Sequence, residues 1–401
     1  MTHVTTTTPQ NLGTLFDPAS RPNPYPVFSA LRSAGPATLF DGVLTLLGEH
    51  ATCTKVLRDP AFSSDRTRSL MQRTLGRGNE RPTSFLSMDP PDHTRLRKLV
   101  AKAFTPRMIA GLEPRIRAIV DELVSGFSDH FDVVGQFGYP LPVRIITEML
   151  GVPQADHDLF EGWSKRLVRG LDPAMAVTDP DEVADIQQAS TEFNEYFTEL
   201  IARRRKTPGA DLLSSLVQIE EQGDKLTKEE LVSTCTLLLV AGHETTANLI
   251  ANGVLALLRH PDQLAELRAD PSLVGGVVEE VLRYDPPVQL TTRIVREPTR
   301  FGGVEASADG VLLIMLGAAN RDPAAFPNPD AFDIHRDARS HLSFAGGAHF
   351  CLGAPLARLE ASVALTAFAT KIKDPHFDET ELTYRPHVNL RGPERFVVRI
   401  G

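Results

Sequence analysis

The spacing of apolar residues along the chain predicts a mainly helical protein. From Leu99 onward, apolar side chains recur every three or four positions in several segments, as they do on one face of an α-helix. The clearest predicted helices are residues 109–124, 139–150, 192–205, 212–220 and 272–283. Short segments at residues 292–295 and 311–315, rich in β-branched and apolar residues, predict strands. Near the N-terminus, residues 37–40 and 43–47 flank Asp41-Gly42, so we expect a β-hairpin with a two-residue type I′ turn.

The longest predicted helix begins at Thr227. Thr227 and Glu230 have the spacing of a capping box, in which the hydroxyl and the carboxylate each accept a hydrogen bond from a free backbone N–H. No proline follows until Pro261, which gives roughly 30 helical residues and about 45 Å of helix. Because the segment is apolar on most faces around residues 237–240, we expect it to run through the core.

Composition and charge indicate how many domains the chain forms and which classes of protein it does not belong to. No repeat or linker divides the 401 residues, which favours one domain over residues 1–401, with a flexible N-terminal tail over residues 1–15. The formal net charge of −9 argues against nucleic-acid binding, which depends on a basic surface. No stretch approaches the ~18 uncharged apolar residues that cross a bilayer, and the Thr-rich start lacks the features of a secretory leader. We therefore expect a cytoplasmic protein that does not bind a membrane.

Cys351 has the most distinctive surroundings of the three cysteines. Cys53, Cys235 and Cys351 are far apart and form no Cys-x-x-Cys pair, which argues against disulfides and against a multi-cysteine zinc site. Cys351 precedes an expected helix at residues 354–368, where free N–H groups and the helix dipole favour a thiolate. Glycines at 346, 347 and 353 permit a tight loop and close approach to a flat ligand. These features alone fit a ligating cysteine and a buried structural cysteine equally well.

The segment from Phe344 to Gly353 resembles the haem-binding signature of the cytochrome P450 family. That signature places Phe, Gly, a basic residue, Cys and Gly at these intervals. The resemblance implies haem b as the cofactor, Cys351 as the axial ligand of the iron and His349 as a ligand of a haem propionate. Ala345 departs from the pattern, since bacterial members more often have glycine there.

The same resemblance implies the fold. It is the single-domain cytochrome P450 fold, mainly α with small β-sheets, in which the haem lies between the long central helix and the helix after the cysteine loop. A second matching segment is Glu280-Val-Leu-Arg283, whose two charged side chains share a helix face and can form a partly buried pair. The family adds an arginine that matches Arg336, and we expect a structural role for all three residues.

Two further segments carry the resemblance into the rest of the chain. In the long helix, the threonines of Ala241–Thr246 can bond carbonyls four residues back and bend the helix. By resemblance, Thr245 steadies bound dioxygen and Glu244 is the acid of a proton relay. His93 and Arg97 are (i, i+4) neighbours on a helix that begins near Asp92, and together with Arg293 they match haem propionate ligands.

Positions 237, 241 and 245 share one face of the long helix, which predicts part of a substrate pocket. Core packing explains the apolar members of the candidate wall equally well. The pocket candidates are Leu237, Val240, Ala241, Val288, Gln289, Thr291, Asn389 and Leu390.

The chain has no G-x-G-x-x-G dinucleotide motif, so its electrons must come from another protein. Arg95, Lys98 and Lys102 form a basic stripe that points away from His93 and Arg97. We expect an acidic ferredoxin, supplied by a ferredoxin reductase, to dock there.

The sequence thus predicts a ferredoxin-dependent haem-thiolate monooxygenase. It would insert one atom of O2, by hydroxylation or epoxidation, into a large, mainly apolar small molecule. A secondary metabolite such as a macrolide or other polyketide, or a steroid, would suit. One alternative is a peroxide-driven peroxygenase, although such relatives tend to lack the pair Glu244 and Thr245. Another is a non-catalytic haem-based sensor, in which this pair would have no purpose.

Overall fold

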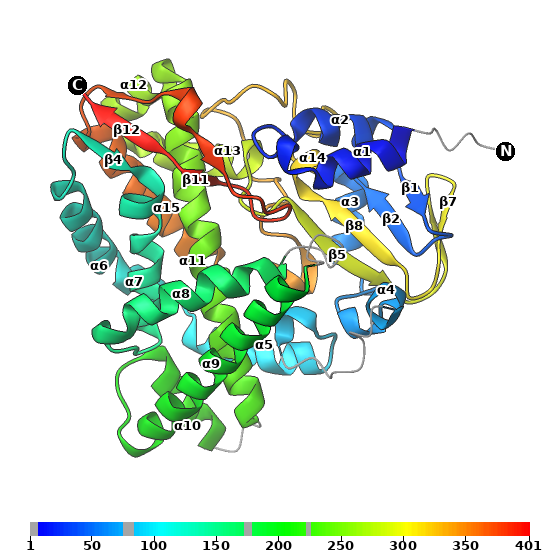
Figure 1. The fold of residues 1–401 in the computed structure, drawn as a ribbon, viewed down its shortest axis with the longest axis horizontal. Helices are drawn as coiled ribbons and strands as arrows, with labels where there is room; N and C mark the ends of the chain where they lie inside the picture. Colours follow the sequence, from blue (N-terminus) through cyan, green and yellow to red (C-terminus); the bar gives the residue numbers. More distant parts are fainter. Residues whose placement is uncertain (1–6, 75–83, 172–178, 222–225) are drawn as a thin grey trace. The chain divides into compact units, whose positions relative to one another are not determined.

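The computed structural model describes residues 7–74, 84–171, 179–221 and 226–401 (Figure 1). The chain divides into two compact units, which are described one at a time. The first unit contains Met1–Pro82, Leu255–Cys351 and Leu382–Glu394. The second unit contains Thr83–Val254, Leu352–Glu381 and Arg395–Gly401. Each unit therefore joins segments that are far apart in the sequence.

A five-stranded sheet organises the first unit, with the strand order β1-β2-β8-β5-β3. Strand β2 runs parallel to β8, and the remaining neighbours are antiparallel. The predicted strands at residues 292–295 and 311–315 are confirmed as parts of β5 and β8. The strands of this sheet are β1 (Ala37–Leu39), β2 (Leu44–Leu47), β3 (Phe62–Ser63), β5 (Leu290–Val295) and β8 (Val311–Met315). The smaller sheets pair β6 (Thr299–Phe301) with β7 (Val304–Ala306), and β10 (Thr383–Tyr384) with β11 (Pro393–Arg395).

The predicted hairpin and its turn are confirmed. Leu39 pairs with Leu44, a register that leaves Asp41 and Gly42 as the two residues of the turn. The N–H of Val43 donates to the carbonyl of Phe40 at 3.1 Å, and Asp41 and Gly42 have positive φ, at 51° and 91°, as a type I′ turn requires. The first strand ends one residue earlier than predicted, because Phe40 also has a positive φ, at 52°.

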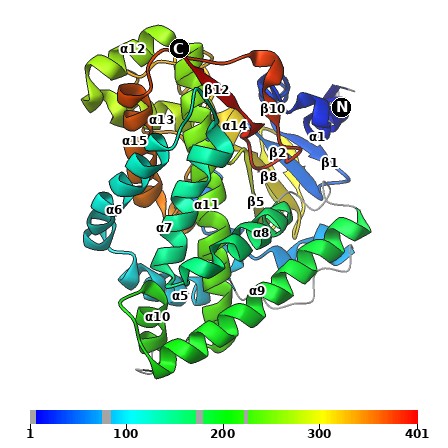
Figure 2. The same cartoon turned by 60° about the vertical axis from the view of Figure 1, so that its left-hand side comes forward.

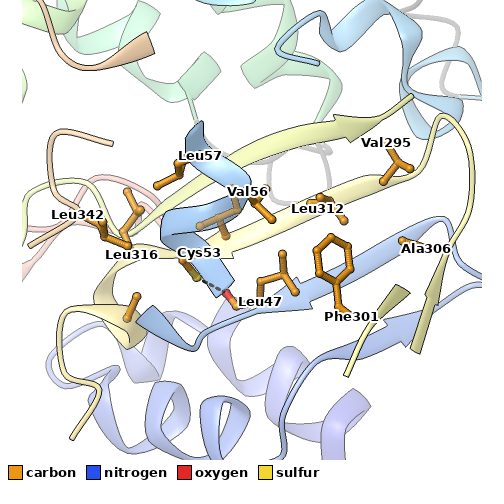
Figure 3. Packing of buried hydrophobic residues seen from close by; sticks show 12 residues of the cluster. Leu47, Cys53, Val56, Leu57, Val295, Phe301, Ala306, Leu312, Leu316 and Leu342 are labelled. Carbon is orange, nitrogen blue, oxygen red and sulfur yellow. Dashed lines mark hydrogen bonds between the residues drawn. The ribbon is translucent and has the colours of Figure 1, made fainter. Parts of the chain in front are cut away.

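Buried apolar side chains fasten helix α3 (His50–Arg58) to this sheet (Figure 3). Cys53 and Val56 are fully buried against Leu47 and Leu312. The thiol of Cys53 donates to the carbonyl of Leu47 at 3.5 Å. Ala345, from the cysteine loop, packs against the same cluster. The core of the first unit thus supports that loop directly.

The helices of the first unit include the predicted segment at residues 272–283, which forms α13. At the N-terminus, the expected flexible tail does not extend over residues 7–15, because these residues lie in α1. Leu12 and Leu15 are buried, which explains why this stretch is helical. Residues 1–6 lie outside the described residues. The helices are α1 (Thr7–Phe16), α2 (Tyr25–Ser33), α4 (Leu70–Thr74), α12 (Pro261–Ala269), α13 (Val274–Tyr284) and α14 (Leu316–Ala319).

Helices make up most of the second unit, and they include four predicted ones (Figure 2). In this unit α15 packs on α6, while α8 and α10 pack on α9. The helices predicted at residues 109–124, 139–150, 192–205 and 212–220 correspond to α6, α7, α9 and α10. The helices are α5 (Asp92–Ala103), α6 (Pro106–Ser125), α7 (Pro140–Met149), α8 (His157–Leu167), α9 (Pro180–Lys206), α10 (Leu212–Glu221) and α15 (Ala354–Lys371). A small sheet has the order β4-β12-β9, from His130–Asp132, Val397–Ile400 and Pro375–His376.

The long helix α11 (Lys228–Arg259) is continuous over 32 residues and confirms the predicted element. Its capping box is formed as expected. Glu230 N donates to Thr227 Oγ1 at 3.2 Å, and Thr227 N donates to Glu230 Oε2 at 3.0 Å. Among the described residues, no helix is long and apolar enough to cross a membrane.

Candidate active site

The cysteine loop is closed by its own backbone. A short 3₁₀ turn, Gly347–His349, stands between Phe344 and Cys351. The N–H of Cys351 donates to the carbonyl of Phe344 at 3.0 Å. Helix α15 begins at Ala354, three residues beyond the thiol. The loop therefore presents Cys351 beside a helix N-terminus, where a thiolate is favoured.

Only Cys351 among the three cysteines is exposed. Burial raises the pKa of the thiols of Cys53 and Cys235 far above the usual range of a cysteine. A thiol that cannot ionise is a poor metal ligand, because the thiolate is the ligating form. The exposed Cys351 thus fits an axial ligand of haem iron, and the two buried cysteines do not.

Two positions of the loop require unusual backbone conformations. Gly347 has a φ of +65°, and a Cβ atom there would lie 2.6 Å from the carbonyl oxygen of Leu57. Ala345 has a φ of +56°, in the left-handed region that favours glycine. Alanine at position 345 is therefore more strained than the glycine that bacterial members of the family more often have there.

The predicted propionate ligands lie in both units. In the first unit Arg293 is buried on β5, with its Nη1 donating to the carbonyl of Thr292 at 2.8 Å, and His349 is half-buried in the 3₁₀ turn. In the second unit His93 is 2% exposed on α5, and its ring lies 6.4 Å from that of Phe85. Arg97 follows one turn later and is half-buried. The helix that the (i, i+4) spacing needs is thus present in α5.

The middle of α11 carries the predicted acid and alcohol. Thr245 Oγ1 donates to the carbonyl of Ala241 at 2.8 Å, and Thr246 Oγ1 donates to the carbonyl of Gly242 at 2.9 Å. These are the hydroxyl–carbonyl bonds that the sequence predicts. Although they can bend a helix, α11 remains continuous here. Glu244, which directly precedes Thr245, is fully buried.

One face of α11 stays open within an otherwise buried stretch. Ala241 is exposed, and Leu237 and Thr245 are half-buried. Their neighbours Leu238 and Leu239 are buried, as is the pocket candidate Val240. The accessible face of α11 is thus the face that the (i, i+4, i+8) spacing predicts as a pocket wall. Val240 does not lie on this face.

His243 is a residue that the sequence patterns did not single out. This residue is fully buried beside Glu244, and its Nε2 lies 3.7 Å from Glu244 Oε1. Ser164 and Tyr139 contact the same nitrogen, at 2.7 Å and 3.2 Å. The spacing along the chain could have drawn attention to His243 as a neighbour of the acid. The contacts from α8 and from the start of α7 could not be read from one sequence.

Glu280 and Arg283 form a buried bidentate pair in α13. Arg283 Nε donates to Glu280 Oε2 at 2.8 Å, and Arg283 Nη2 donates to Glu280 Oε1 at 2.7 Å. Arg336 Nε reaches Glu280 Oε1 at 3.3 Å. Arg283 also donates to the carbonyls of Asn320, Pro329 and Ala331, between 2.7 and 3.1 Å. The three charged residues are therefore brought together, and they tie the irregular segment after Asn320 to α13.

The remaining pocket candidates lie side by side in the first unit. Val288 and Leu390 form an isolated antiparallel bridge. Gln289 N donates to the carbonyl of Asn389 at 2.9 Å, and Leu290 N donates to Asn389 Oδ1 at 3.0 Å. Gln289 is 1% exposed, with its Nε2 donating to the carbonyl of Pro286, whereas Thr291 is half-buried on β5. The two amide side chains are thus engaged in holding the backbone.

Comparison with known proteins identifies the family. The pattern described as "Cytochrome P450" matches residues 154–373. The vitamin D(3) 25-hydroxylase of Pseudonocardia autotrophica is 42% identical over 409 residues, covering 99% of this chain and 98% of that protein. The 6-deoxyerythronolide B hydroxylase of Saccharopolyspora erythraea is 41% identical over 323 residues, covering 79% and 78%. The ligand-free crystal structure of Mycobacterium smegmatis CYP164A2 is 45% identical, with a TM-score of 0.92, and the match covers 98% of this chain and 100% of that one.

The chain belongs to the cytochrome P450 family, and it has the mainly helical fold with small sheets that this family shares. It is a cytochrome P450 monooxygenase. Membership implies a haem cofactor, a small-molecule substrate and redox partner proteins.

Proposed function

We propose that this monooxygenase receives its electrons from a ferredoxin and uses O2, rather than peroxide, to oxidise a large, mainly apolar small molecule. The observation that carries the proposal is the pairing, in one turn of α11, of a buried acid with an alcohol on the open face. Thr245 is half-buried there, and Glu244 is fully buried next to it. A positioned acid and alcohol are what dioxygen activation requires of the protein, because protons must be delivered without bulk water.

Haem b, when bound, supplies the iron chemistry that oxidises an unactivated carbon. The residues proposed to hold it are Cys351, as the axial thiolate, and His93, Arg97, Arg293 and His349, as propionate ligands. The exposed thiol and the basic character of the other four side chains fit this group. The role of the chain itself is to orient these groups and to control protons.

Thr245 and Glu244 provide the proton control in this proposal. The Thr245 hydroxyl now donates to the carbonyl of Ala241 at 2.8 Å. Rotation about its C–O bond can turn the same proton toward the open face of the helix. Glu244 can restore the proton through a water molecule, because successive side chains on a helix do not face each other. Burial keeps this carboxyl away from bulk water.

The proposed substrate is a macrolide, another polyketide or a steroid-like molecule. The accessible face of α11 presents the apolar side chains Leu237 and Ala241. Because Asn389 and Gln289 bind the backbone, the remaining wall candidates are mostly apolar. Two relatives are named as hydroxylases of vitamin D3 and of 6-deoxyerythronolide B, which are both large and mainly apolar. These names support the substrate class without fixing the compound.

The purified haem-loaded enzyme tests the proposal in two arms. The first arm compares turnover with O2 and reduced ferredoxin against turnover with hydrogen peroxide, using vitamin D3 and 6-deoxyerythronolide B as probes. We expect product from the ferredoxin arm, and Thr245→Ala should lower its rate about 10²–10⁴-fold while hydrogen peroxide accumulates. Product formed only with peroxide would support a peroxygenase, and binding without turnover would support a sensor.

The second arm tests the iron ligand. Carbon monoxide added to the reduced enzyme should give the red-shifted Soret band of a thiolate-ligated haem. Cys351→Ala should abolish the band, whereas Cys53→Ala and Cys235→Ala should retain it. Retention of the band by Cys351→Ala would overturn the ligand assignment.

A further inference from the structure

His243 is a buried histidine whose tautomer is fixed by its surroundings. Its Nδ1 lies 2.7 Å from the carbonyl oxygen of Leu239, one turn earlier in α11. Because a carbonyl oxygen can only accept a hydrogen bond, Nδ1 must carry a proton. The other ring nitrogen, Nε2, is therefore the atom that can gain or lose a proton.

Two hydroxyl groups hold Nε2 from outside α11. Ser164 Oγ, on α8, lies 2.7 Å away, and Tyr139 Oη, just before α7, lies 3.2 Å away. The Tyr139 ring stands edge-on to the imidazole, with the centroids 5.3 Å apart. All of these residues belong to the second unit. The ring of His243 is thus fixed from three sides.

The same Nε2 faces the proposed acid of the relay. It lies 3.7 Å from Glu244 Oε1, and both side chains are 0% exposed. This distance is too long for a good hydrogen bond but short enough for an ion pair. A carboxylate buried without a compensating charge is strongly disfavoured. A protonated His243 can provide that charge without any movement of the ring.

We propose that His243 is a positioning residue for Glu244. Its charge favours a carboxyl turned toward Nε2, and it balances the carboxylate that remains when Glu244 passes its proton through water to Thr245, whose own proton leaves toward the open face of α11. His243 itself transfers no proton in this step, since its Nε2–H stays directed toward Ser164 Oγ. The inference rests on the proposed function, because it deepens the role assigned to Glu244. A purely structural histidine, which only fastened α8 and α7 to α11, would not act through the acid.

A double-mutant cycle in the full-length, haem-loaded enzyme separates these two roles. The readout is the fraction of consumed O2 that appears in product rather than in hydrogen peroxide, for His243→Phe, Glu244→Ala and the double variant. We expect His243→Phe to lower this fraction about tenfold, less than the roughly 10²–10⁴-fold typical of a missing proton donor, because the acid itself remains. The double variant should be no worse than Glu244→Ala alone, because the histidine acts through the acid.

The outcomes distinguish the inference from the proposed function. Unchanged coupling in His243→Phe, or losses that multiply in the double variant, would overturn the role of His243 alone. Normal coupling in Glu244→Ala would instead overturn the proton relay. If His243→Phe does not bind haem, Ser164→Ala serves in its place. It keeps the imidazole and removes the 2.7 Å contact, and it should lower coupling about threefold, by less than loss of the ring. Full coupling in Ser164→Ala would count against the inference.

His260, the residue that directly follows α11, offers a control. Its Nδ1 contacts the carbonyl of Ala256, four residues back, at 2.8 Å, which is the same local geometry as in His243. It stands outside the Ala241–Thr246 segment. His260→Phe should therefore leave the coupling at the level of the parent enzyme. An equal loss of coupling in both histidine variants would point to a general effect on α11 and would overturn the inference.

Discussion

Replacing Glu280 by glutamine tests whether the buried charge cluster of α13 stabilises the fold. The change keeps the volume of the side chain and removes its charge. Arg283, which is 0% exposed, would then lose the carboxylate that accepts two of its hydrogen bonds. Arg336 would lose the same partner at 3.3 Å. Two buried or nearly buried cations would face a neutral amide.

The structure sets the size of the expected effect. Removing one partner of a buried ion pair typically costs about 3–5 kcal/mol. Arg283 retains three carbonyl acceptors, at 2.7 to 3.1 Å, and the backbone N–H of Asp333 still has an oxygen to bond at 2.9 Å. Because these bonds remain, we expect a cost near the lower end of that range, about 3 kcal/mol. The total free energy of unfolding of a protein is typically about 5–15 kcal/mol. We therefore expect a folded but clearly destabilised enzyme.

Urea unfolding followed by circular dichroism measures the effect. With a denaturant slope of about 3 kcal/mol per molar, the unfolding midpoint of Glu280→Gln should fall by about 1 M. The matched control is Glu113→Gln on α6, whose partner Arg117 is 58% exposed while Glu113 is 41% exposed. An exposed pair at this spacing contributes at most about 0.5 kcal/mol, which moves the midpoint by less than 0.2 M. Equal midpoints for the two variants would refute the reasoning.

The remaining tests concern Glu360, Ala345 and two lysines of α5. Burial raises the pKa of Glu360 to about 8, from the usual 4.5, so its protonated form stabilises the fold below about pH 4.5 and that stability is lost as the pH rises to about 8. In the parent enzyme the free energy of unfolding should fall by about 1.4 kcal/mol per pH unit across this range, and Glu360→Gln should remove that fall. Thermal unfolding between about pH 5 and 8 measures it, and a variant with the same pH dependence as the parent would contradict the prediction. Ala345→Gly should stabilise the fold by about 0.5 kcal/mol, because relief of the left-handed strain exceeds the entropy cost of glycine. The urea midpoint should therefore rise by roughly 0.2 M, and a lower midpoint would contradict this. Charge reversal at Lys98 and Lys102, which are both exposed, should raise the KM for ferredoxin, most clearly at low salt, without changing peroxide-supported turnover. An unchanged KM at low salt would exclude this docking surface.

The sequence correctly predicted the helices, strands and caps whose stabilising contacts lie between residues close together in the chain. The helices at residues 109–124 and 212–220 and the strand at 311–315 are found close to their expected bounds, because long apolar periodicity leaves little choice of structure. The capping box of α11 was predictable for the same reason, since both partners lie within one turn. The Asp41-Gly42 turn of the hairpin was predictable too, because a two-residue turn with positive φ is determined by its own residues. Helix α1 was missed, since its helical state depends on the burial of Leu12 and Leu15.

The charged residues of α5 show what spacing along a single helix can predict and what it cannot. Spacing along α5 correctly separates His93, which is buried, from Lys98, which is exposed. It cannot show that Arg95 forms a bidentate ion pair with Glu230, the capping residue of α11, 135 positions away. Arg95 therefore has a partner inside the protein, and reversing its charge would disturb the start of α11 as well as any docking surface. Tests of ferredoxin docking must leave Arg95 unchanged, because its partner Glu230 belongs to the helix that carries the acid and the alcohol, and they use instead the exposed residues Lys98 and Lys102.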